Sequence, residues 1–138
     1  MIESAILTAL QSDGALAQLV STYANAPAIF SESAPEGAAE PYVTFDISRV
    51  VAESDVLDVF NIMVDFWDMS QKSRAKSRQA AQRIEFVLDG ATLQTDRYDT
   101  IRVWYESAGP VPEPDPRYIH HNLQFMARAG RKAWAEQL

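Results

Sequence analysis

The chain has 138 residues, 47% of them hydrophobic and 22% charged, which is the size and composition of one globular domain. Twelve Lys and Arg against nineteen Asp and Glu give a net charge of −7 (12 − 19), which opposes non-specific binding to nucleic acid or anionic lipid. No cysteine is present, which excludes disulfides, thiolate nucleophiles and the commonest zinc sites. The first residues carry an acid at Glu3, no basic stretch and no long apolar run, so we expect a soluble protein made in the cytoplasm, without signal peptide or membrane span.

Apolar residues at helical spacing mark the first twenty residues. They are Ile2, Ile6, Leu7, Leu10, Leu16, Leu19 and Val20. Asp13 and Gly14 interrupt the pattern, so it predicts one helix or a broken pair of helices, packed along one stripe. The Ala-, Ser-, Pro- and Gly-rich segment 23–40 then predicts a loop with a short strand at AIFSES, residues 28–33.

Two segments alternate between apolar and polar residues and therefore predict half-buried strands: PYVTFDISRV (41–50) and VFNIMVDFWDM (59–69). Between them, VAESDVLD (51–58) carries Glu53, Asp55 and Asp58. This acidic segment predicts an exposed connection or the flared arms of a hairpin.

The next segment, QKSRAKSRQAAQRIEFVLDG (71–90), changes to the helical period, with Ser70 as a candidate N-cap and Gly90 as the stop. Its inward stripe is predicted to be Ser77, Ala80, Ala81, Ile84, Val87 and Leu88. Two further strands are predicted at DTIRVWYES (99–107) and RYIHHNLQFMARA (117–129). Between them, AGPVPEPDP (108–116) has four prolines in nine residues and predicts a stiff, exposed connection that does not continue a strand ladder.

The element order predicts an α+β fold, with a mostly antiparallel sheet of about four to five strands and two main helices packed on one face. We expect residues 1–130 to form a single domain. Residues 131–138 are expected to be a short, largely polar C-terminal tail that carries Trp134.

His120 and His121 are the only histidines, and they are consecutive in a predicted strand. Neighbouring side chains of a strand point to opposite faces, so the two rings do not readily converge on one metal ion. His121 is predicted to face the helices, as a hydrogen-bonded residue at the boundary of the core, and His120 to face outward. Both are interpreted as structural residues.

Other catalytic patterns are weak. Asp65 and Asp68 are three residues apart, which places them on opposite strand faces and argues against a pair of acids acting across a cleft. The sequence has neither a G-x-S-x-G elbow nor a phosphate-binding glycine loop. We therefore predict no catalytic, cofactor-binding or metal-binding residue.

Five of the twelve basic residues cluster in the second predicted helix: Lys72, Arg74, Lys76, Arg78 and Arg83. They flank its apolar stripe. One interpretation is a solvated helix surface that keeps the domain soluble. The other is electrostatic pairing with the acidic 53–58 arm of a neighbouring copy, a heterologous contact of the kind that closes rings.

The strand faces opposite the predicted core are unusually apolar. They carry Tyr42, Met63, Trp67, Trp104, Tyr118 and Met126. Antiparallel sheets covered on one side usually show polar residues there. This surface is either an association site or is covered by a second layer from the N-terminal helix or the loop.

Several of these segments occur in one layout: an amphipathic N-terminal helix, a Pro/Ala-rich stretch ending in PYVTFDI, a strand NIMVDFWDMS running into an Ala/Arg-rich helix, and a late strand YIHHNLQFMARA. The layout covers Ile2 to Ala129. It resembles the tail-completion proteins of long-tailed bacteriophages, also called tail terminator or tail-to-head joining proteins.

The resemblance implies a small α+β domain that forms a hexameric ring. Such a ring caps the head-proximal end of the tail tube, stops its polymerisation and presents a surface to head-completion or connector proteins. The expected location is the virion, at the head–tail interface, after synthesis in the host cytoplasm. The resemblance implies no catalytic residue and no cofactor, and DNA passes through the ring without specific recognition.

The resemblance makes residues 48–58 and 109–116 the expected contacts with neighbouring subunits or the tube. Together with the basic helix and the outward tryptophans, they form the candidate interface. Its residues are Arg49, Glu53, Asp55, Asp58, Lys72, Arg74, Lys76, Arg78, Trp67, Trp104, Pro112 and Pro114.

Two other functions stay open at the level of sequence. One is a small-molecule-binding α+β domain, or an enzyme built on one, with His121 and Tyr105 directed into an apolar cavity. The other is a head-side connector protein of similar fold, which binds the portal side of the interface in place of the tube.

Overall fold

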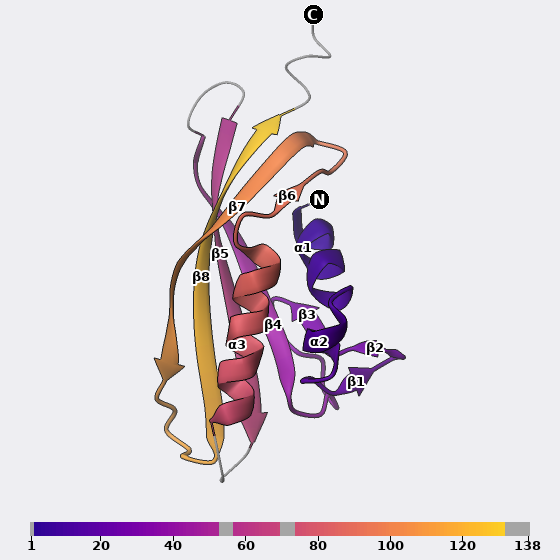
Figure 1. Cartoon of the computed structure of the whole chain (residues 1–138), viewed down its shortest axis with the longest axis vertical. Coiled ribbons are helices and arrows are strands. Elements are labelled where there is room, and N and C mark those ends of the chain that lie inside the picture. The colour runs from indigo at the N-terminus through magenta and orange to yellow at the C-terminus, as the bar shows by residue number, and fades with distance from the viewer. Residues whose placement is uncertain (1, 53–56, 70–73, 132–138) are drawn as a thin grey trace, which may run out of the picture.

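The computed structural model describes residues 2–52, 57–69 and 74–131, and Figure 1 shows the chain. In chain order its elements are α1 (Ile2–Gln11), α2 (Gly14–Ala17), β1 (Thr22–Tyr23), β2 (Ala26–Pro27), β3 (Ile29–Ser31), β4 (Tyr42–Ala52), β5 (Leu57–Met69), α3 (Ala75–Leu88), β6 (Thr92–Leu93), β7 (Tyr98–Val111) and β8 (Tyr118–Arg131). Strands account for 49% of the structure and helices for 23%. The protein is therefore mostly β.

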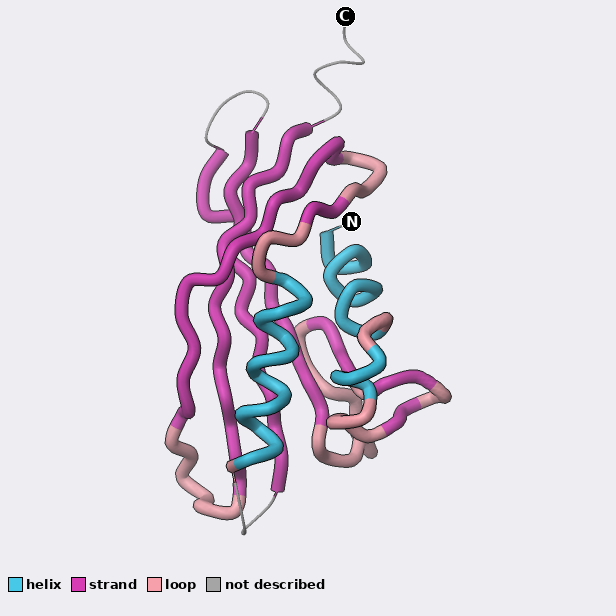
Figure 2. Tube along the Cα trace, viewed as in Figure 1, coloured by secondary structure: helices cyan, strands magenta, loops and turns pink. Residues whose placement is uncertain are grey.

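One curled sheet of six strands dominates the molecule, in the order β3-β4-β5-β8-β7-β6. β3 runs parallel to β4, and the other neighbouring strands are antiparallel. A small hairpin of β1 and β2 stands apart from it. Figure 2 shows the helices together in front of the sheet, where α3 packs on β5, β7 and β8, and α1 packs on β3 and α3.

The expectation of two main helices on an antiparallel sheet of four to five strands is wrong. The fold has one main helix, α3, because Asp13 ends the first helical stripe and caps a separate single turn, its carboxylate accepting a hydrogen bond from the Leu16 N–H at 2.9 Å. The sheet is mixed because Ile29 pairs in parallel with Val43. The two-residue strand β6 adds a sixth member that no alternating pattern marked.

The core lies between the helices and the inner face of the sheet. The long pair β5–β8 keeps one register from Leu57↔Gly130 to Met69↔Tyr118, so every second residue of each strand faces the helices. The predicted inward stripe of α3 is correct: Ser77, Ala80, Ala81, Ile84 and Leu88 are buried, and Val87 packs against the core. The largest fully buried rings are those of Phe45, Phe66 and Phe125.

The proline-rich segment begins later than predicted. β7 continues through Pro110, which pairs with His121, to Val111, which pairs with His120. Proline is tolerated there because β6 pairs with β7 only near Ile101 and Arg102, so β7 has no described neighbour on its other side at Pro110. The connection that remains between β7 and β8 is residues 112–117, named here the proline connection.

Helix α3 starts at Ala75, and Arg74 occupies its N-cap position without a side-chain cap. The predicted N-cap, Ser70, lies outside the described residues. None of the helices in the described ranges has the length and hydropathy that a membrane span requires.

Candidate assembly surface

The sheet face turned away from the helices is named here the outer face. Cross-strand pairing places its side chains in rows, for example Tyr42, Trp67, His120 and Val111 in one row. The full set considered below is Tyr42, Thr44, Asp46, Asn61, Met63, Asp65, Trp67, Trp104, Tyr118, His120, Asn122, Gln124 and Met126. The predicted outward apolar residues therefore do share one face.

These apolar side chains are not covered by a second layer from the N-terminal helix, because α1 packs on β3 and α3 at the other face. Figures 1 and 2 show the outer face without any described helix over it. Trp67, Trp104 and Met126 are half-buried by their neighbours, and Met63 is exposed. The indole N–H of Trp104 donates to Glu106 at 2.7 Å. An apolar surface of this kind, left open by the chain's own layers, fits association with another protein.

His120 is the centre of the polar part of this face. Although it points away from the helices, it is only 9% exposed. Its Nε2 lies 2.6 Å from a carboxylate oxygen of Asp65 on β5, and its Nδ1 lies 2.7 Å from a carboxylate oxygen of Glu113 in the proline connection. The Asn122 amide donates to the same Asp65 oxygen at 2.9 Å. His120 therefore joins β8, β5 and the proline connection.

An aromatic ring completes the enclosure of His120. The indole of Trp67 stacks on the imidazole with ring centroids 3.7 Å apart and planes 15° from parallel. The indole N–H donates to the Thr44 hydroxyl on β4 at 3.2 Å. Within the described ranges, no group of three His, Asp or Glu side chains is arranged to hold a metal ion. This cluster is therefore a hydrogen-bonded and stacked arrangement that links three strands and one connection.

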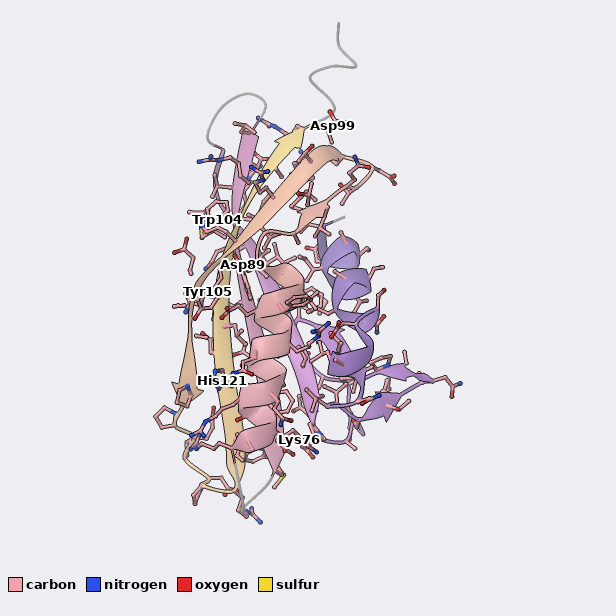
Figure 3. All side chains as sticks on the ribbon, viewed as in Figure 1. Lys76, Asp89, Asp99, Trp104, Tyr105 and His121 are labelled. Carbon is pink, nitrogen blue, oxygen red and sulfur yellow. The ribbon has the colours of Figure 1, made fainter. Side chains whose placement is uncertain are left out.

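His121 has a different environment on the opposite face. It is half-buried against α3, and Figure 3 shows it beside that helix. Burial lowers its pKa below the ordinary histidine value, and the positive charges of His120, Arg74 and Arg78 act in the same direction. The prediction that it faces the helices is correct. In the described residues it has no hydrogen-bond partner, so the predicted hydrogen bond is not supported.

The pocket hypothesis needs His121 and Tyr105 at one cavity, and the structure separates them. A shallow hollow of about 220 Å³ is lined by Arg78, Ala81, Gln82, Glu85, Ala108, His121 and Leu123. The Tyr105 ring instead packs edge-to-face on Phe125, with centroids 5.9 Å apart. A larger open groove of about 560 Å³ lies between α1 and the segment 93–96, lined mainly by small and hydroxyl residues.

The basic residues of α3 divide into two groups. Arg74, Lys76 and Arg78 are exposed in the first turns of the helix. Arg83 instead turns towards α2 and forms a two-armed ion pair with Asp13, with both N···O distances at 2.7 Å. Lys72 lies outside the described residues. The exposed basic surface is therefore concentrated at the start of α3.

The acidic arm differs from its prediction. Asp58 was expected to be exposed, but it is fully buried and accepts a hydrogen bond from the Tyr98 hydroxyl at 2.9 Å, with Arg131 Nε at 3.8 Å. Burial raises the pKa of Tyr98, and the Asp58 carboxylate raises it further. Glu53 and Asp55 lie outside the described residues, and Arg49 is exposed on β4. Asp58 acts in packing, so it is not available as a surface charge.

Within one copy, the basic start of α3 and Asp58, the described acidic residue of the 53–58 arm, lie at opposite ends of the sheet. β4 and β5 pair from Tyr42↔Trp67 at one end to Ala52↔Asp58 at the other. Arg74 follows shortly after β5 ends at Met69, so the basic start of α3 lies at the Tyr42 end. The connection 32–41 leads into β4 at the same end and carries Glu32, Glu36 and Glu40, of which the first two are exposed. Sequence reasoning passed over these glutamates because they lie in a loop-like segment.

Pro112 and Pro114 are exposed on the proline connection. The connection is folded on itself: the Arg117 guanidinium pairs with Asp115 at 2.7 Å, and the Tyr118 N–H donates to the Asp115 carbonyl at 3.1 Å. This ion pair holds the pKa of Asp115 below its usual value. Both candidate prolines are therefore presented on an ordered segment.

Comparison with known families adds the evidence that geometry does not supply. Residues 4–130 match the family model of the tail completion protein gp17. The chain belongs to this family. The predicted resemblance to tail-completion proteins is thereby confirmed, and the tail completion protein is a structural component of a phage tail.

Solved structures share the fold of this tail completion protein. A chain in a structure described as the virion of a native gene transfer agent particle is 22% identical, with a TM-score of 0.79 and 94% of each chain covered. A second solved structure is 16% identical, with a TM-score of 0.59, and the match covers 95% of this chain and 93% of the other. No curated protein is significantly similar in sequence.

Proposed function

We propose that this tail completion protein forms a ring at the head-proximal end of a phage tail tube, where it ends tube growth and joins the tail to the head. Support comes from the family match together with the outer face, a broad aromatic and methionine-bearing surface that the chain's own helices leave open. The outer face is the observation that carries the assembly role. A hexameric ring is the form that the family resemblance favours.

The charge distribution favours one contact between neighbours in such a ring. Ring neighbours are related by a rotation, so two surfaces that meet have the same height and the same radius. The basic start of α3 and the acidic connection 32–41 share one end of the sheet, so they have similar heights if the strands run along the ring axis and similar radii if the strands run along the radius. We therefore assign the partner of Arg74, Lys76 and Arg78 to the 32–41 connection of the next copy, in place of its 53–58 arm.

The same proposal gives roles to the other parts of the molecule. Residues 1–130 act as one assembly domain, and the proline connection and the residues around Arg49 contact the tube or the head-side connector protein. DNA passes through the ring without specific recognition, and the net charge of −7 limits its adhesion to the protein. The function is structural, and the protein resides in the virion at the head–tail interface.

Complementary charge reversal tests the ring contact. One variant carries Arg74→Glu, Lys76→Glu and Arg78→Glu, and another carries Glu32→Lys, Glu36→Lys and Glu40→Lys. Each variant alone has like charges at the proposed contact, so each is expected to show a lower native mass by light scattering than the unmodified ring. Mixed together, they regain opposite charges at every contact and are expected to reassemble.

Reversal of Asp96 and Asp99 to lysine is the matched control, because both are exposed and lie near the other end of the sheet. The control is expected to leave the native mass unchanged. Reversal variants that assemble as the unmodified protein does would remove the proposed contact. Tail tubes that are capped even so would leave the terminator role standing with a different subunit interface.

A further inference from the structure

His120 is a buried titratable group to which the proposed function gives no role. It is 9% exposed and contacts two carboxylates, from Asp65 and from Glu113, at 2.6 and 2.7 Å. Burial of a polar side chain lowers the stability of the fold unless the side chain makes hydrogen bonds. The His120 imidazole thereby holds Asp65 of β5 and Glu113 of the proline connection together.

The number of protons on the two nitrogens of the His120 imidazole decides which of these contacts are hydrogen bonds donated by the imidazole. A neutral imidazole has a single N–H and donates to one carboxylate, leaving the other nitrogen lone pair facing an anionic oxygen. The imidazolium has an N–H on each nitrogen and donates to Asp65 and Glu113 at the same time. When both carboxylates are ionised, both contacts are hydrogen bonds if each imidazole nitrogen carries a proton.

Charged and titratable groups face His120 from several elements. Asp65 faces it from β5 and Glu113 from the proline connection, while the stacked Trp67 presents its negative π face. Arg117 is engaged by Asp115 within the proline connection. On β8 the neighbouring groups are Tyr118 and, on the opposite face, His121, whose pKa is lowered partly by His120. Two carboxyl groups and one indole thus surround the His120 imidazole.

Glu113 attaches the proline connection to the outer face. In the described part of the chain, its contact with His120 is the one side-chain hydrogen bond that leads from residues 112–117 to a strand side chain. The connection is stiff, because it contains three prolines and the Asp115–Arg117 pair. The connection continues β7 at Val111 and β8 at Tyr118, so the Glu113 contact is the side-chain anchor of the stiff part between these two strand ends.

We propose that His120 is a clasp that fixes the proline connection to the sheet through its contacts with Asp65 and Glu113, and that it sets how Pro112 and Pro114 are presented to an assembly partner. Removal of the imidazole, or of the charge on either carboxylate, releases the connection while β5 and β8 remain paired. The last step, presentation to a partner, rests on the proposed function. The clasp itself does not.

Tryptophan emission provides the first test. In a background with Trp104→Phe and Trp134→Phe, Trp67 is the remaining tryptophan, and its emission reports the contact with the stacked His120 imidazole. His120→Gln removes the stacked imidazole and is expected to change this emission. The matched control His121→Gln removes the adjacent histidine on the other face and is expected to leave the emission unchanged.

Limited trypsin cleavage after Arg117 provides the second test and does not alter a strand. Glu113→Gln removes the negative charge of one side chain in the proline connection and leaves every residue of the sheet unchanged. Cleavage is expected to accelerate about tenfold, the factor that corresponds to about 1.4 kcal/mol. Glu36→Gln changes an exposed glutamate in the connection that leads into β4 at this end of the sheet, and this control is expected to cleave at the original rate.

The clasp is overturned if His120→Gln leaves the Trp67 emission unchanged, or if Glu113→Gln and Glu36→Gln cleave alike. Its failure is distinguishable from failure of the proposed function. If Glu113→Gln opens the connection yet caps tail tubes as well as the unmodified protein does, the clasp stands and its link to assembly falls. If the unmodified protein itself caps no tubes, the terminator role falls.

Discussion

The two faces of the sheet bury their side chains in different ways. The adjacent residues His121, on the inner face, and His120, on the outer face, have correspondingly different surroundings. On the inner face, α1 and α3 cover apolar residues, and His121 is desolvated without a hydrogen bond from any described residue. On the outer face no described helix lies above His120, which is nevertheless buried by hydrogen bonds and by Trp67. One face is thus stabilised by a covering layer and the other by contacts between neighbouring strands.

This difference separates stability from function. The inner face is closed, so its residues contribute to the free energy of unfolding through burial. The outer face is organised but open, so its half-buried aromatic residues are available to another protein. Substitutions on the inner face are therefore expected to affect folding first, and those on the outer face to affect assembly first.

The largest expected effect is on the inner face. Phe125→Ala removes a fully buried ring beside Tyr105 and is expected to destabilise the fold by about 3–5 kcal/mol. Trp104→Ala on the outer face, where the indole is half-buried, is expected to cost about 1–2 kcal/mol while reducing native mass or tube binding. Urea denaturation and light scattering measure the two effects. Equal losses of stability would break the comparison between the faces.

A buried polar pair at the far end of the sheet comes second. Tyr98→Phe keeps the ring contact with Phe60, whose centroid lies 5.8 Å away, but removes the hydroxyl that donates to buried Asp58. The carboxylate then loses a buried donor, and the expected cost is about 1–3 kcal/mol. Tyr118→Phe removes a half-buried hydroxyl and serves as the control, with little change expected in the denaturation midpoint. If Tyr98→Phe left the denaturation midpoint unchanged, another donor would have to supply the hydrogen bond to the Asp58 carboxylate.

The ion pair between helices α2 and α3 comes third. Asp13→Ala removes both the cap of α2 and the contact with Arg83, and is expected to cost about 1–2 kcal/mol. Asp13→Asn retains a cap acceptor and is expected to cost less. Hydrogen bonding to Arg83 holds the pKa of Asp13 below its ordinary value, so this stability is present above about pH 4 and is lost as the pH falls through the folded-state pKa.

Denaturation of Asp13→Asn and the unmodified protein at several pH values measures this dependence. The two stabilities are expected to converge in acid. A difference that stays constant down to the acid limit would show that the charge of Asp13 does not contribute.

The smallest expected effect distinguishes the histidines by pH. Burial, followed by the charges of His120, Arg74 and Arg78, lowers the folded-state pKa of His121, so below about pH 6.5 the unfolded chain binds more protons at this position. The unmodified protein is therefore expected to lose stability relative to His121→Gln as the pH falls from 7.5 to 5.5. Urea midpoints at both values test this. A loss of the same size in the variant would show that His121 is not the group responsible.

Local patterns predicted the strands whose two faces differ. The alternation in residues 41–50 and 59–69 marked β4 and β5, because one face of each is buried in the core. The short strand predicted at 28–33 is present as β3, but its parallel pairing with β4 is a tertiary contact that leaves no periodicity of its own. The same holds for the two residues of β6, which pair with β7 and were not predicted. The fold class was therefore missed even though its longest elements were found.

The same reasoning applies to the site. A period of two was enough to place His120 and His121 on opposite faces. The clasp was missed because Asp65 lies 55 residues from His120 in sequence and meets it only through the pairing of β5 with β8. Asp58 was predicted to be exposed because its partner, Tyr98, is 40 residues away. The shared outward parity of Asp65, Trp67 and His120 was the available signal.

The length of tail tubes assembled with and without this protein tests the central claim most directly. Cognate tail-tube protein is polymerised and imaged by electron microscopy as the tail completion protein is added. The account predicts that tubes stop growing and carry a ring-shaped cap at one end, and that Trp104→Ala weakens this effect. Tubes of unchanged length without caps would contradict the terminator role. If the protein then bound a head-side connector protein and did not bind the tube, the outer face would belong to the other side of the head–tail interface.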